Sequence, residues 1–113
     1  MIIALIPTSA TAETLLNNLA EADFDSADIS VIMRDPKARN AIASDSGPLK
    51  GVLVKDLPTK LAQAHAAAAD VPGFIQGVQN GKVLVAIRAQ KASEAAAVEM
   101  LNDHQAELVR VLP

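Results

Sequence analysis

The sequence predicts an α+β sandwich in which two strand–helix–strand units share one four-stranded antiparallel sheet. Two uninterrupted apolar runs support this: Val83 to Ile87, which follows an Asn80-Gly81 turn signal, and Ile2 to Ile6, which ends at Pro7. Neither run alternates between apolar and polar residues, so both faces of each strand need cover and both strands belong at the centre of a sheet. A helical pattern and a second, shorter strand follow each run at similar spacing.

The first unit contains one amphipathic helix and one edge strand. Three polar residues are candidate N-caps of the helix: Thr8, Ser9 and Thr11. Its apolar residues recur at helical spacing up to about Ala22. A turn then leads to a strand over Ile29 to Met33, in which Ser30 predicts a less buried position at the edge of the sheet.

The second unit repeats this plan after Val83 to Ile87. Ser93 is the expected N-cap of its helix, and the last strand runs from Glu107 to Leu112. Arg110 interrupts the apolar pattern of that strand and predicts the other edge position. The whole arrangement predicts a ferredoxin-like split βαβ sandwich, with residues 1–113 forming a single domain.

Residues 34–80 lie between the second and third strands and are expected to form a helical insertion. An alanine-rich helix is predicted from Pro58 towards Asp70, and a short helix is predicted from Pro72 to Val78. A connection of this length is uncommon without secondary structure of its own.

The two unit helices can cover only one face of the predicted sheet. Leaving the other face in water would cost about 25 cal/mol per Å² of apolar area, so something must bury it. Either a second subunit packs against this open sheet face, or the alanine-rich inserted helix folds beneath it. We expect a homo-oligomer, with a dimer as the first choice, because symmetric dimers are the commonest assemblies of small domains.

Composition bounds the partners and the compartment. The net charge of -3 at pH 7 repels phosphate backbones, so a nucleic-acid role is disfavoured. No cysteine is present, which excludes disulfides, thiol nucleophiles and thiolate metal sites. The N-terminal apolar run is too short for a signal peptide or a membrane span. We therefore expect a cytoplasmic protein with no membrane partner.

A search for catalytic chemistry assigns no catalytic, cofactor-binding or metal-binding residue. The two histidines, His65 and His104, lie far apart and have no partner at ligand spacing. Asp23, Asp25 and Asp28 resemble the start of a calcium loop, but the turn glycine and the distal glutamate are missing. No phosphate-binding, dinucleotide-binding or nucleophile-elbow motif occurs, so we expect no cofactor and no enzyme activity.

One polar loop is a candidate ligand site. Arg34, Lys37 and Arg39 follow the second strand and gather three basic residues near the end of the sheet. Loops that a rigid sheet holds in place often carry binding groups, so an anion or a small-molecule effector could bind there. The alternative is a solvated loop whose charges maintain solubility.

Four stretches of the chain resemble the small heat-induced or general stress protein domains of bacteria: Leu19 to Phe24, Asp28 to Ile32, Val71 to Ala89 and Leu101 to Ala106. The resemblance implies a ferredoxin-like fold and a stress or accessory role without enzyme activity, and it transfers no active-site residues. Our first expectation is therefore a non-enzymatic accessory protein that acts through homo-oligomeric or protein–protein contacts. The alternative is a small-molecule sensing module, like the amino-acid-binding and nitrogen-regulatory ferredoxin-like proteins, that binds an effector at a subunit boundary.

Overall fold

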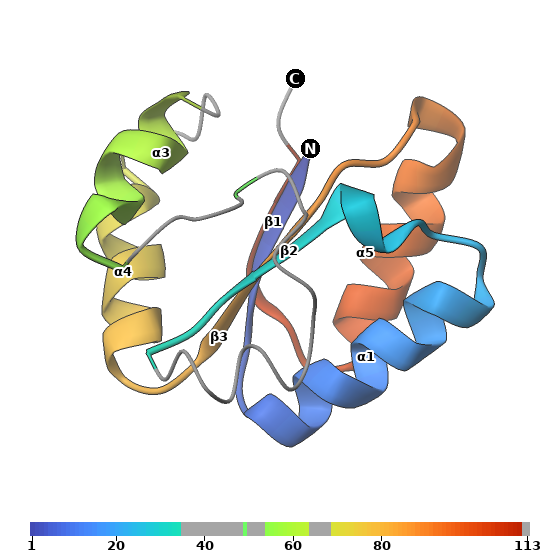
Figure 1. The fold of residues 1–113 in the computed structure, drawn as a ribbon, viewed down its shortest axis with the longest axis horizontal. Helices are drawn as coiled ribbons and strands as arrows, with labels where there is room; N and C mark the ends of the chain where they lie inside the picture. The colour runs from blue at the N-terminus through green and yellow to red at the C-terminus, as the bar shows by residue number, and fades with distance from the viewer. Residues whose placement is uncertain (35–48, 50–53, 64–68, 112–113) are drawn as a thin grey trace.

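The computed structural model describes residues 1–34, 49, 54–63 and 69–111 (Figure 1). The elements follow one another in this order: β1 (Ile2–Ile6), α1 (Ser9–Glu21), η1 (Ser26–Asp28), β2 (Ile29–Ile32), η2 (Val54–Asp56), α3 (Leu57–Gln63), α4 (Val71–Gln79), β3 (Val83–Ile87), α5 (Lys91–Asp103) and β4 (Glu107–Val111). The predicted α+β class and the four-stranded antiparallel sheet are confirmed.

The sheet has the strand order β2-β3-β1-β4, and every neighbouring pair is antiparallel. The β1–β3 register pairs Ile2 with Ile87 and Ile6 with Val83, so the two apolar runs lie side by side along their whole length. All residues of both strands are buried. The sheet is therefore built around β1 and β3, with β2 and β4 at its edges.

One face of the sheet packs against α1 and α5. Because side chains alternate along a strand, Ile2, Ala4 and Ile6 of β1 point to this face together with Val83, Val85 and Ile87 of β3. The helices contribute Leu15, Leu19, Ala97 and Leu101, all fully buried. These residues form one continuous apolar cluster beneath the two unit helices.

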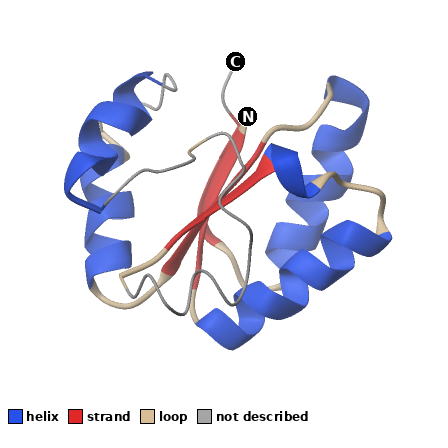
Figure 2. Ribbon diagram, viewed as in Figure 1, coloured by secondary structure: helices blue, strands red, loops and turns tan. Residues whose placement is uncertain are grey.

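The opposite face packs against α3 and α4 of the same chain, so helices flank the sheet on both sides (Figure 2). Ile3 and Leu5 of β1 lie on this face, and the covering side chains are Leu49, Leu57, Leu61, Phe74 and Val78. The inserted helices thus cover the open sheet face: Leu57 and Leu61 come from the start of the predicted alanine-rich helix, whose residues 64–68 lie outside the described part of the chain, and α4 supplies the rest. The apolar area that led us to expect a second subunit there is already buried within one chain.

The helix N-termini show one expected cap and one correction. Thr8 caps α1, because its Oγ1 accepts a hydrogen bond of 3.2 Å from the backbone N–H of Thr11. The prediction of Ser93 as the N-cap of the last helix is wrong. That helix, α5, begins at Lys91 with Gln90 at the cap position, and the N–H of Ser93 donates to the Gln90 carbonyl oxygen at 2.8 Å.

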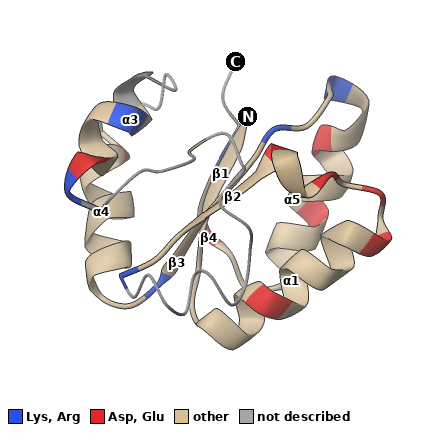
Figure 3. Ribbon diagram, in the orientation of Figure 1, with Lys and Arg blue, Asp and Glu red and all other residues tan. Residues whose placement is uncertain are grey.

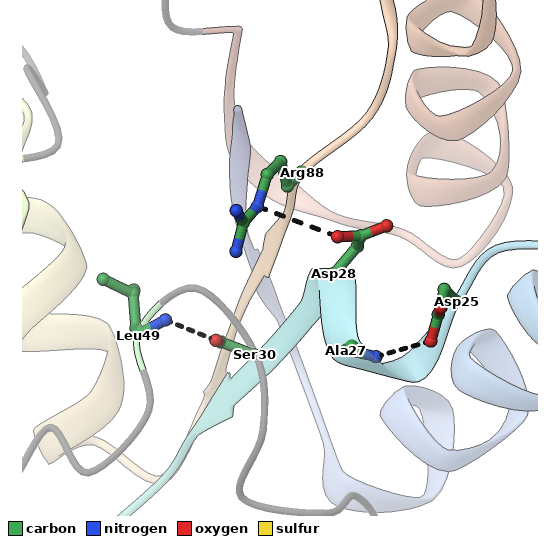
Figure 4. A network of polar contacts seen from close by, with 6 residues as sticks. All are labelled: Asp25, Ala27, Asp28, Ser30, Leu49 and Arg88. Carbon is green, nitrogen blue, oxygen red and sulfur yellow. Dashed lines mark hydrogen bonds and ion pairs between the residues drawn. The ribbon is translucent and has the colours of Figure 1, made fainter.

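Ser30 lies at the sheet edge, but the prediction that it is poorly buried is wrong. Only 5% of its surface is exposed, and its hydroxyl faces the backbone nitrogen of Leu49 (Figure 4). Its Oγ accepts a hydrogen bond of 2.6 Å from the backbone N–H of Leu49. The hydroxyl thus satisfies the buried backbone N–H of Leu49, which is why a polar residue is tolerated inside an apolar strand.

Replacement of Ser30 by alanine is expected to lower the free energy of unfolding by about 1–2 kcal/mol, because the buried N–H of Leu49 loses its acceptor. Urea unfolding followed by circular dichroism measures this change. The matched control is Ser26→Ala at an exposed position in η1, which should stay within about 0.5 kcal/mol of the wild type. Equal effects of the two substitutions would contradict the role given to the Ser30 hydroxyl.

Candidate functional site

Arg34 is the one member of the predicted basic cluster that lies within the described residues; Lys37 and Arg39 lie outside them. The exposed Arg34 side chain follows β2, and its Nη1 donates a hydrogen bond of 3.4 Å to the carbonyl oxygen of Gln79 at the C-terminal end of α4. A cation is favourable at this negative end of a helix dipole. Among the described residues, then, Arg34 supports the end of α4, and the effector-binding alternative stays a prediction.

Lys82 is the basic residue that the β2–β3 register brings nearest to Arg34. Ile32 pairs with Leu84, so extending the ladder by two residues places Arg34 across from Lys82. Figure 3 shows basic residues at the end of β2 and at the start of β3. However, Lys82 forms an ion pair with Glu107 of β4, which offsets its charge. Of the two described basic residues at this end of the sheet, Lys82 is therefore already paired within the chain.

His104 links α5 to α1. Its Nδ1 lies 2.7 Å from the carbonyl oxygen of Met100, which can only accept, so this nitrogen donates. In the neutral ring Nε2 then accepts from the Asn18 amide nitrogen at 3.0 Å. Both ring nitrogens are thus occupied by protein contacts at the C-terminal end of α5. The other histidine, His65, lies outside the described residues.

The acidic turn before β2 separates its carboxylates among different contacts (Figure 4). Asp25 caps η1, accepting a hydrogen bond of 2.9 Å from the N–H of Ala27, and Asp28 lies 3.7 Å from Arg88. In the described part of the chain, no group of three or more histidine, aspartate or glutamate side chains is placed to hold a metal ion. The side chains of this turn thus cap a short helix and form a surface ion pair.

A shallow hollow of about 690 Å³ lies between α5 and the end of β4. Its apolar residues are Ala95, Val98 and Val111. Val111 has 49% of its surface exposed, which makes it a large apolar side chain in contact with water. Together with the exposed Ala95 it gives the hollow an apolar part that is in contact with water.

Charged side chains of α5 surround the hollow: Lys91, Glu94, Glu99 and Asp103. Three are carboxylates and one is an ammonium, so the hollow is negatively charged.

The sequence analysis missed this site, because helical periodicity identifies the buried stripe of α5 but not which neighbouring element its exposed stripe meets. The one feature of the sequence that could have indicated the site is the last turn of α5, which carries Asp103 and no basic residue to balance it.

The edge at β4 is irregular. The β1–β4 register shifts between Ile3 and Leu5, and Leu108 has a positive φ of 51°. A bulge of this kind twists an edge strand and makes it a poor template for a further strand. The side chains that line the hollow, rather than the backbone of β4, are therefore the groups available for recognition here.

No protein-family model matches this chain, and comparison with curated proteins and with solved structures gives no significant match. The resemblance to bacterial stress protein domains thus stays a prediction from the residues that carry it. Within the described residues, no helix has both the length and the apolar character needed to cross a membrane.

Proposed function

We propose that this chain is a non-enzymatic accessory protein of the stress-associated kind, acting through contacts with protein chains, and that the contact surface is the hollow between α5 and β4. The exposure of Val111 beside Ala95 and Val98 is the observation that supports this most. Both faces of the sheet are already filled by the chain's own helices. Among the described residues, Val111 is the large apolar side chain that stays exposed, and it lies at this edge.

We further propose that the fold is the ferredoxin-like split βαβ arrangement with a helical insertion between β2 and β3. The strand order with β1 and β3 at the centre supports it, as do the helices α1 and α5 on one face. In this arrangement α3 and α4 belong to the insertion and protect the face that a two-layer domain would leave open. The hollow then belongs to the second βαβ unit.

A site-specific crosslinking experiment tests the proposed contact surface. Because the chain has no cysteine, Ala95→Cys creates a unique attachment point in the hollow for a thiol-reactive photo-crosslinker. We expect the labelled protein to form crosslinked adducts with other protein chains. Denaturing gel electrophoresis should show these adducts as bands of higher mass, and mass spectrometry should identify them. Unlabelled wild-type protein should compete for these adducts, whereas a Val111→Asp variant should compete poorly, because it places a charge on the apolar rim.

Thr59→Cys is the matched control, since Thr59 is exposed on α3 on the opposite side of the sheet. The same label there should give few adducts that wild-type protein can compete for. If the two positions gave equal adducts, or if Ala95→Cys gave none, the hollow would not be a contact surface and the proposed function would fail.

A further inference from the structure

We infer that the partner at the α5–β4 hollow is an amphipathic protein segment that carries an apolar side chain flanked by arginine or lysine. This inference rests on the proposed function and adds the chemistry of the partner. The apolar group would contact Ala95, Val98 and Val111, and the cationic groups would lie over Glu99 and Asp103.

Two carboxylates towards the C-terminal end of α5 are arranged against the helix's own stability. Glu99 and Asp103 are four residues apart, so their carboxylates lie on the same face and repel each other. Asp103 is also the last residue of α5, where the helix dipole disfavours negative charge. Within the described residues, neither side chain takes part in an ion pair, and the last turn contains no basic residue.

Local rules that a sequence breaks without compensation inside the fold often mark functional positions. A guanidinium or ammonium group from a partner would relieve the repulsion between Glu99 and Asp103 and would also face the negative end of the dipole. Lys91 lies at the opposite end of the same stripe. Glu94 lies beside Lys91 there and offsets its charge, so the net negative charge of the stripe is concentrated near Glu99 and Asp103.

A second copy of the chain fits this surface less well. The hollow has three carboxylates and one ammonium, so two copies facing each other through it would bring like charges together. The whole chain also has a net charge of -3. Charge complementarity therefore favours a basic partner segment over self-association.

The test is a ¹H–¹⁵N titration of the full chain with a blocked peptide of alternating arginine and leucine. Shift changes should concentrate on α5 and Val111, and raising the salt concentration should weaken binding. Two comparison peptides of the same length replace every arginine with glutamate or every leucine with glycine, and both should bind at least about tenfold more weakly.

The double variant Glu99→Gln with Asp103→Asn should weaken binding of the arginine–leucine peptide by about tenfold. Its melting temperature should stay the same or rise, because an unfavourable charge pair has been removed. Glu13→Gln with Glu21→Gln on α1 is the matched control, since both residues are exposed and neither lines the hollow. It removes the same charge and should leave the affinity unchanged.

Three results would overturn the inference: no binding of the arginine–leucine peptide, equal binding of the glutamate peptide, or an affinity that Glu99→Gln with Asp103→Asn does not change. If Val111→Asp instead lowered the solution mass measured by light scattering, the occupant would be a second copy. In each case competed adducts from Ala95→Cys would leave the proposed contact function standing, whereas their loss would reject that function itself.

Discussion

Replacement of Phe74 by alanine is expected to lower the free energy of unfolding by about 3–5 kcal/mol. Phe74 is the largest fully buried side chain among the described residues and lies in the cluster between α4 and the sheet. Its removal takes away the transfer free energy of an aromatic ring and leaves a cavity that the neighbouring strands cannot fill. Urea unfolding measures the change, and equal m-values would indicate that the variant and the wild type expose the same surface area on unfolding.

Gln79→Ala is the control for this substitution, because Gln79 is an exposed residue of the same helix. It should change stability by less than about 0.5 kcal/mol. The comparison tests whether α4 covers the second sheet face in solution. A loss below about 1 kcal/mol for Phe74→Ala would mean that this ring is not part of the core, and the burial of that face within one chain would be rejected.

The centre of the fold could be predicted from the sequence because a short, unbroken apolar run next to turn residues strongly favours a strand buried on both faces. Ile2 to Ile6 and Val83 to Ile87 are fully apolar, and both lie at the middle of the sheet with every residue buried. The helix α1 also begins and ends close to its predicted bounds. These elements depend on local pattern and burial, which the sequence contains directly.

The cover of the second face could not be predicted with the same certainty, because it depends on where an insertion folds. Periodicity indicated two helices in residues 34–80, but a helix pattern does not specify which surface its apolar side will meet. Leu49, Leu57 and Phe74 meet on the sheet only in three dimensions. For this reason a second subunit and an inserted helix were both consistent with the residues.

The two candidate sites also differ in whether the sequence alone reveals them. The basic cluster was visible as a run of charge, yet in the described residues it contributes only Arg34, whose guanidinium contacts the end of α4. The hollow was not visible, because Val111 belongs to β4 while its neighbours Ala95 and Val98 belong to α5. Only the packing of α5 against the sheet brings these residues together.

Gly77 marks the closest approach of α4 to the sheet. A glycine within a helix costs about 1 kcal/mol relative to alanine, so its presence needs a reason. Gly77 is buried, and a Cβ added there would overlap the Cδ1 of Leu5 and lie 3.0 Å from its Cδ2. Leu5 is itself only 2% exposed and cannot easily move aside.

We therefore expect Gly77→Val to lower the free energy of unfolding by about 3 kcal/mol, because the branched side chain forces α4 away from β1. Gly73→Ala is the control on the same helix: its Cβ would meet only the Cδ1 of Leu108, a half-buried residue of an edge strand that can shift. In a Leu5→Ala background the space is vacated, so adding Gly77→Val should cost less than about 1 kcal/mol. Urea unfolding of the four proteins in this cycle gives the coupling directly. An equal cost of Gly77→Val in both backgrounds would show that Leu5 does not set the distance between α4 and β1.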